Sequence, residues 1–321
     1  MLMAAAGAAA ADEQTLMVWS YRGGPVIEPL LEAFTAQTGL AVEYRVLGGD
    51  GIVEAMLDDS QSLPDLVLVV DALRMDTLKQ AGRLRPLPAG AVTEIAPKWR
   101  DGDGYWTGIS WRARSVVRRA DDHGPADLDA LRQLAVDGQL CIREGAHVYN
   151  RGFLSWLNAN LGEAAAMAWA TAVFDNRAEV EGGDRDQIRA VAEGRCSAAV
   201  VNHYYLMRWA ASEDPAERAI ADGLVFGWPD PSIPVAVNVS AIALPSTGRP
   251  AEAADQLAIW LAGRDAQAMY AVSVFEFPLN WPAQQIPLAP GLDRLQLNPG
   301  TPWPAELPLY RKAAEAFFDP P

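Results

Sequence analysis

Short apolar runs alternate with longer segments of helical periodicity through the first eighty residues. One run, LVLVV, is continuously apolar, which is typical of a strand covered on both faces. The longest periodic segment ends at a glycine, the usual stop signal of a helix. The order strand, helix, strand, helix, strand, helix predicts a parallel sheet flanked by helices. The predicted strands are Thr15–Ser20, Ala41–Val46 and Leu66–Val70, and the predicted helices are Pro25–Thr38, one from Ile52 and one from Asp71 to Gln80.

A second α/β block follows, and a last strand and helix complete the pattern. Because the two blocks have no flexible linker between them, we expect an α/β protein with two lobes that the chain joins along hinge strands. The hinges are placed at Gly108–Val117 and Val235–Leu244. The lobes are predicted as residues 12–111 plus 236–285 and residues 112–235 plus 286–321. The other predicted elements are strands Leu140–Arg143 and Ala198–Val201 and helices Gly152–Leu161, Glu163–Val173, one after Gly182–Asp184 and Ala251–Ala262.

Composition narrows the class of partner. The chain has 321 residues and a formal net charge of −15, which argues against nucleic acid or an anionic membrane surface. Residues 1–11 resemble the end of a secretory signal with its cleavage site, so we expect export to the periplasm. We also expect the protein to be a monomer. Two cysteines, Cys141 and Cys196, form either one disulfide or two buried thiols.

The most specific chemical signal is the run VNHYY. Neighbouring side chains on a strand point to opposite faces, so Tyr204 and Tyr205 can serve one site only if the strand ends at Val201. A phenol has a pKa near 10, and only a strongly polarising cation such as Fe(III) removes its proton at neutral pH. Alone, a tyrosine pair is equally typical of interfaces and helix ends.

Eight segments, in this order and spacing, resemble the ferric-iron-binding proteins of bacterial ABC importers. The similarity extends from Leu16 to Phe318 and is carried by VWSYR, EAFTAQTGL, PDLVLVVDALRM, GISWRARSVV, LCIREGAHVYN, GGDRDQIRAVAEGRCSAAVVNHYY, VNVSAIAL and FEFPLN. It implies a type II periplasmic binding protein, or Venus flytrap, that captures Fe(III) and docks to a membrane permease. It also implies iron ligation by Tyr149, in a VYN turn, and by Tyr204 and Tyr205. Finally, it implies a Cys141–Cys196 disulfide that ties the two ligand-bearing segments together.

The sequence departs from this family at one ligand position. Relatives carry His-Tyr or a similar donor after the first strand, whereas here Arg22 is followed by Gly23 and Gly24. The second lobe then supplies all three phenolates, and carbonate or another anion completes the iron shell. Tyr21, one residue out of register, is an alternative donor.

Glycine backbone and guanidinium groups suit an anion. The anion-binding candidates are therefore Arg22, Gly23, Gly24, Arg112 and Arg114, each with a structural ion pair or turn as the alternative. Asp50, in the loop Gly49–Gly51, is expected to cap a helix. His147 and His203 flank the tyrosines and are not expected to bind the metal.

Two other functions compete with iron transport. A binding protein for an oxyanion or small organic anion would use the same arginines and glycines, since a fold does not fix a function. An enzyme is disfavoured because the sequence has no nucleophile–base pair and none of the common catalytic metal motifs.

Overall fold

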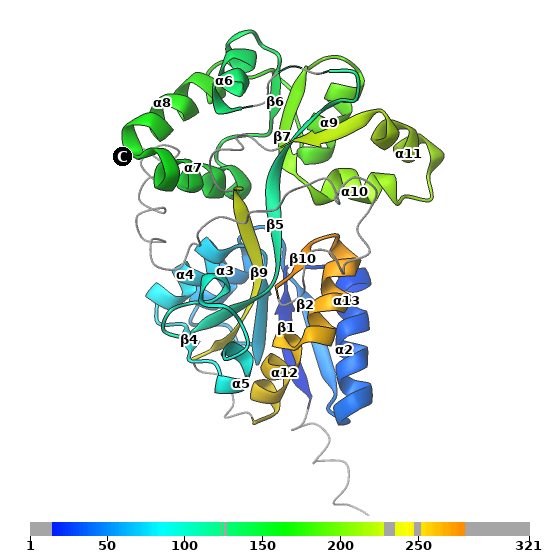
Figure 1. Cartoon of the computed structure of the whole chain (residues 1–321). Coiled ribbons are helices and arrows are strands. Elements are labelled where there is room, and N and C mark those ends of the chain that lie inside the picture. The colour runs from blue at the N-terminus through cyan, green and yellow to red at the C-terminus, as the bar shows by residue number, and fades with distance from the viewer. Residues whose placement is uncertain (1–14, 123, 125–126, 228–234, 247–251, 280–321) are drawn as a thin grey trace, which may run out of the picture. The chain divides into compact units, whose positions relative to one another are not determined.

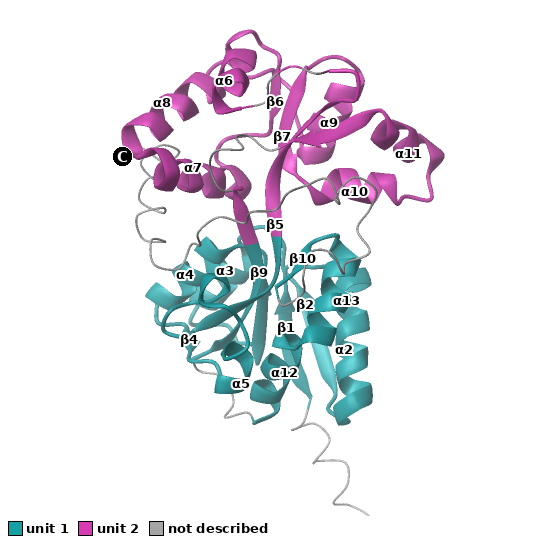
Figure 2. Ribbon diagram, viewed as in Figure 1, with its two compact units in different colours: residues 1–111, 239–281, 303–305 teal, residues 112–238, 282–302, 306–321 magenta. Residues whose placement is uncertain are grey.

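The computed structural model describes residues 15–122, 124, 127–227, 235–246 and 252–279 (Figure 1). These residues form two compact units. Unit 1 comprises residues 15–111 and 239–279, and unit 2 comprises residues 112–238 (Figure 2). Two strands, β5 (Trp106–Arg119) and β9 (Val237–Pro245), contain residues of both units. The predicted lobe boundaries stay a prediction. Residues 12–14, 280–285 and 286–321 of the predicted lobes lie outside the described residues, as does the predicted signal remnant at residues 1–11.

Unit 1 is built on three parallel strands. β1 pairs in parallel with β2 and β3, and β3 pairs antiparallel with β9. Its helices cover the faces of this sheet, and short strands lie beside it (Figure 1). In chain order they are β1 (Leu16–Ser20), α2 (Gly24–Thr38), β2 (Val42–Val46), α3 (Gly51–Leu57), β3 (Leu66–Val69), α4 (Ala72–Gln80), β4 (Leu84–Arg85), α5 (Ala89–Val92), the 3-10 helix Pro97–Trp99, α12 (Glu252–Ala262), α13 (Arg264–Val274) and β10 (Phe277–Pro278).

The core of unit 1 follows from the predicted periodicity. The buried face of α2 carries Ile27, Leu30, Leu31 and Phe34, and these side chains join residues of β1, β3, α12 and α13 in one apolar cluster. Gly39 ends α2 with φ 77°, a left-handed conformation that suits glycine. The predicted strands and helices of this unit are confirmed to within one or two residues.

Unit 2 has a smaller sheet. β6 pairs in parallel with β7, and β5 pairs antiparallel with β7 and with β8. Its elements are α6 (Leu128–Val136), β6 (Leu140–Ile142), α7 (Val148–Leu161), α8 (Glu163–Phe174), α9 (Asp184–Ala192), β7 (Ala198–Asn202), α10 (Tyr204–Ala210), α11 (Pro215–Asp222) and β8 (Leu224–Gly227).

Strand alternation divides the core of unit 2 into two layers. Val116, Ile142 and Val200 face one apolar cluster with α6, α7 and α8. The neighbouring residues Val117, Cys141 and Val201 face a second cluster with α9 and α10. Both faces of the sheet are therefore buried, as expected for strands between two helical layers. Within the described ranges, no helix is both long and apolar enough to cross a membrane.

Candidate functional site: three phenols in unit 2

The end of β7 creates the tyrosine pair. The strand stops at Asn202 and α10 begins at Tyr204, so the two tyrosines lie in the first turn of a helix and no longer alternate across a sheet. Their rings lie 4.4 Å apart, centre to centre, at an angle of 41°. The predicted end of the strand is thus confirmed, and it lets both phenols face one region.

Tyr149 joins this pair from α7. Its hydroxyl lies 3.0 Å from the hydroxyl of Tyr204, and both side chains are almost fully buried. Tyr205 is half-buried and also interacts with both phenols. The structure therefore brings together all three tyrosines named from the sequence, from two different helices.

The expectation that Tyr149 lies in a turn before the helix is wrong. The helix was predicted from Gly152, but it begins at Val148, so Tyr149 lies in its first turn. His147 caps this helix because its Nδ1 accepts a hydrogen bond from the Tyr149 backbone N–H at 3.2 Å. Histidine is not among the preferred capping residues, and the sequence therefore gave no start signal here.

His203 has a structural role. It is fully buried, and its Nδ1 accepts a hydrogen bond from the backbone N–H of Ala113 at 3.1 Å. This contact attaches the start of α10 to β5. No group of three or more His, Cys, Asp or Glu side chains suited to a metal occurs in the described part of the chain.

Arginines surround the phenols. The guanidinium carbons of Arg112, Arg143 and Arg114 lie 5.4, 5.5 and 6.0 Å from the centre of the Tyr149 ring. That of Arg208 lies 5.3 Å from the centre of the Tyr204 ring. A guanidinium at this distance from an aromatic ring is attracted to the ring by a cation–π interaction. The sequence predicted Arg112 and Arg114 as anion-binding candidates, but it did not indicate Arg143 or Arg208.

The pKa of the third phenol, that of Tyr205, depends mainly on burial. Desolvation raises the pKa of Tyr205 well above its ordinary value, and the Tyr149 and Asp184 groups raise it further. Its hydrogen bond with Tyr204 lowers the pKa, but less than the other causes raise it. The Tyr205 phenol is therefore a weaker acid in the folded protein than in water.

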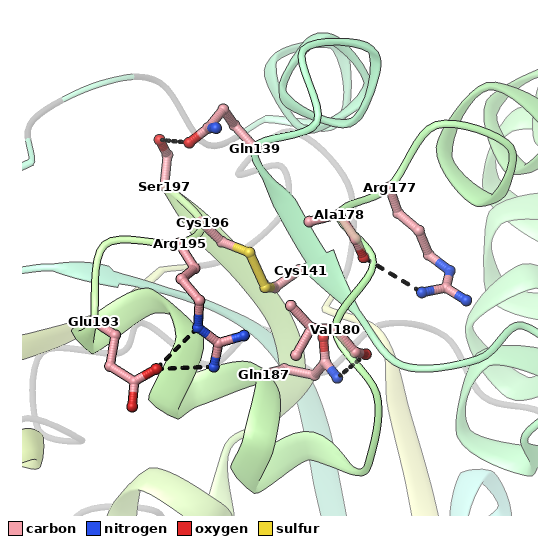
Figure 3. The surroundings of a disulfide bond; sticks show 10 residues. All are labelled: Gln139, Cys141, Arg177, Ala178, Val180, Gln187, Glu193, Arg195, Cys196 and Ser197. Carbon is pink, nitrogen blue, oxygen red and sulfur yellow. Dashed lines mark hydrogen bonds and ion pairs between the residues drawn. A yellow bond between two sulfur atoms is a disulfide. The ribbon is translucent and has the colours of Figure 1, made fainter.

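The predicted disulfide is present in unit 2. Cys141 of β6 and Cys196, just before β7, are bonded with their Cα atoms 5.8 Å apart (Figure 3). Ser197, beside it, donates a hydrogen bond to Oε1 of Gln139 at 3.2 Å. The bond therefore joins the segments that lead into α7 and α10, which carry the tyrosines.

The anion candidates of unit 1 have protein neighbours. Arg22 donates from Nη2 to Glu276 at 2.5 Å and from Nε to Tyr270 at 3.0 Å. Gly23 is the N-cap of α2. A Cβ added at Gly24 would lie 2.7 Å from the Glu28 carboxylate, so this position has an acid as its neighbour.

The expectation that Asp50 caps a helix with its side chain is wrong. Its backbone is not extended, with φ −93° and ψ 5°, so the carboxylate makes no capping bond to α3. It instead accepts a hydrogen bond from Nε of Arg74 at 2.7 Å.

Comparison with known proteins settles the family. The model of the bacterial extracellular solute-binding protein family matches residues 19–268. This chain belongs to that family. Iron uptake protein A1 of Synechocystis sp. is 30% identical over 84% of this chain and 76% of its own length.

Solved structures agree with this family assignment. The iron- and citrate-bound protein of Trichodesmium (IdiA, FutA) shares 26% identity, covers 94% of this chain and 97% of its own, and gives a TM-score of 0.81. The apo ferric ion-binding protein A of Pasteurella haemolytica shares 25% identity over 95% of both chains, with a TM-score of 0.82. The predicted type II periplasmic binding protein fold is therefore confirmed.

Proposed function

We propose that this family member is a periplasmic carrier that captures Fe(III) with Tyr149, Tyr204 and Tyr205 and delivers it to an ABC importer. The observation that supports it most is the 3.0 Å contact between the hydroxyls of Tyr149 and Tyr204, with Tyr205 beside them. Three oxygen donors this close can bind a single ion. The curated and structural relatives named above are described by their iron uptake, their iron ligand or their ferric-ion binding.

Charge balance favours a trivalent metal. Three phenolates carry three negative charges, which Fe(III) neutralises without residual charge in a buried site. The raised pKa of Tyr205 opposes ionisation unless a strongly polarising cation binds. A hard trivalent ion meets this requirement better than a divalent ion does.

An exogenous anion completes the iron shell in this proposal. Each tyrosine supplies one oxygen. Because Fe(III) prefers six ligands, the three tyrosines leave positions open around it. Arg112 is the best placed of the predicted anion candidates because its guanidinium lies 5.4 Å from the Tyr149 ring. Carbonate or a carboxylate such as citrate fits a guanidinium fork.

Ferric loading tests the proposal directly. Purified protein is mixed with ferric citrate in bicarbonate buffer, and unbound iron is removed. We expect one bound iron, a visible band from phenolate-to-iron charge transfer and a higher melting temperature. Gallium(III) is the matched control because it should stabilise the protein without the band. Colourless protein without iron or stabilisation would contradict the proposal.

A binding protein for an oxyanion or organic anion is the second candidate. It is favoured by the arginines around Tyr149, which would grip an anion without any metal. A melting-temperature screen of carbonate, phosphate and citrate, each with and without Fe(III), separates the two. Stabilisation by an anion alone, unchanged by iron, supports this second function.

A further inference from the structure

One buried guanidinium in unit 2 contacts the segments that carry the tyrosines. Arg114 of β5 is 5% exposed. Its Nη1 donates to Oδ2 of Asp184 at 2.7 Å, and its Nη2 donates to Oδ1 of Asn150 at 2.7 Å. It also donates to the carbonyl oxygen of Val200 at 3.1 Å and to Oδ1 of Asn202 at 3.4 Å. These acceptors belong to α7, α9 and β7.

Two of these acceptors are neighbours of the tyrosines in the chain. Asn150 directly follows Tyr149, and its amide also donates to the carbonyl oxygens of Arg143 and Glu144 at 3.0 and 2.9 Å. Asn202 stands two residues before Tyr204. The planar guanidinium of Arg114 therefore joins the start of α7 to the end of β7.

Asp184 holds this guanidinium in place. Its Oδ2 accepts from Arg114 and from the backbone N–H of Asn202, each at 2.7 Å. Its carboxylate is almost fully buried at the start of α9. The second oxygen, Oδ1, lies 3.7 Å from Nη1 of Arg143, so the buried carboxylate makes its shorter ion pair with Arg114.

The same contacts orient the amide of Asn202. Because its Oδ1 faces a guanidinium, its Nδ2 is the end that reaches Tyr204, and it donates to that hydroxyl oxygen at 3.2 Å. A donor at this position stabilises a phenolate and costs nothing when the phenol is neutral, since a hydroxyl oxygen also accepts. Asp184, Arg114, Asn202 and Tyr204 thus form a connected chain.

We propose that Arg114, held by Asp184, is a positioning residue that sets Tyr149 against Tyr204, and is not a ligand of the anion. This inference rests on the proposed function for its effect on iron, although the positioning itself exists without metal. It assigns different roles to two arginines that alternate on one strand. The guanidinium carbons of Arg112 and Arg114 lie 5.4 and 6.0 Å from the centre of the Tyr149 ring, and the Nη groups of Arg114 donate to Asp184 and Asn150.

The test replaces Arg114 with lysine. R114K keeps the charge for Asp184, but an ammonium cannot reach acceptors on three elements at once. We expect iron affinity, measured by competition with citrate, to fall by about ten- to a hundredfold and the charge-transfer band to shift. Raising bicarbonate should not restore the affinity. R119K is the matched control, because Arg119 lies on the same strand in an exposed ion pair with Asp121.

A second variant and a metal-free measurement guard against misfolding and against failure of the iron proposal. N150A keeps the Arg114–Asp184 pair and removes the link from Arg114 to α7, together with the bonds from the Asn150 amide to the carbonyl oxygens of Arg143 and Glu144, so it should shift the same band. Without iron, carbon NMR of ring-labelled tyrosine should show displaced Tyr149 and Tyr204 resonances in both variants. The resonance of Tyr44, which lies on β2 in unit 1, should stay unchanged. If wild-type protein binds no iron, these resonances alone test whether Arg114 positions the tyrosines. Folded variants with unchanged resonances, or affinity restored by bicarbonate, would overturn the positioning role.

Discussion

The side chains that follow the parallel strands have different partners in the two units. In unit 2, β7 ends before Tyr204 and Tyr205, and the loop after β6 leads to Tyr149, so three phenols gather among arginines. In unit 1, β1 ends before Tyr21 and Arg22, but Arg22 is bound by Glu276 and the Tyr21 ring packs 5.3 Å from the guanidinium of Arg74. Similar sheet edges therefore hold three clustered phenols in one unit and internal pairs in the other.

This difference teaches that residue type at a strand end is not enough to identify a ligand. Arginine at the end of β1 suggests an anion site from sequence alone, yet the buried carboxylate of Glu276 satisfies it from 254 residues away. Glu276 also accepts from Ser110 and Ser240, which lie on β5 and β9. The partners available in the fold decide whether a charged group can face a ligand.

Removal of one phenol should have the largest effect. Tyr204→Phe deletes a donor that contacts both Tyr149 and Asn202, so we expect iron affinity to fall by more than the roughly hundredfold typical of losing an outer-shell partner. The measurement is citrate competition followed by the visible band. Tyr21→Phe in unit 1 is the matched control and should change affinity less than about twofold. Equal losses in the two variants would show that unit 1 also supplies a ligand.

The sequence predicts the fold well because its signals are local. Apolar runs, helical spacing and Gly39 each act within one element, and the strands and helices of unit 1 therefore matched within one or two residues. The tyrosine site was predictable in part, because the apolar run visibly stops before Tyr204 and Tyr205, whereas Tyr149 was named only through the family resemblance. The start of α7 was missed because His147 is an unusual cap. The pairing of Arg114 with Asp184 was missed because a contact over 70 residues leaves no local pattern.

The disulfide should stabilise unit 2 and leave unit 1 unchanged. Cys141 and Cys196 are 55 residues apart, and closing a loop of that length contributes roughly 4 kcal/mol by restricting the unfolded chain. A double Cys→Ser variant should therefore lower the denaturant midpoint of unit 2. Hydrogen exchange, read separately for β7 and β1, checks this. Equal loss of protection in both strands would mean that the two units unfold as one.

The Arg22–Glu276 pair should matter for stability and not for iron. Arg22→Gln leaves the buried Glu276 carboxylate without its cation, and breaking such a pair costs about 3 kcal/mol. We expect a lower free energy of unfolding for unit 1 with unchanged iron and bicarbonate dependence. Glu276→Gln in the same background should recover part of the loss, because it removes the uncompensated charge. A weaker bicarbonate dependence in R22Q would instead restore Arg22 as an anion ligand.

The smallest effect is alkaline destabilisation of the iron-free protein. The pKa of Tyr205 is raised in the folded state, so below pH 10 the phenol is neutral in both states and adds no pH dependence. Above pH 10 the unfolded chain releases this proton while the folded chain keeps it, and stability falls by at most about 1.4 kcal/mol per pH unit. Tyr205→Phe should flatten the unfolding free energy measured from pH 9 to 11. The buried Tyr270 of unit 1, whose pKa is also raised, should leave a residual slope that a Tyr270→Phe change reduces. A slope unaffected by Tyr205→Phe would mean that the phenol titrates in the folded protein as it does in water, which would contradict the effect of burial on its pKa.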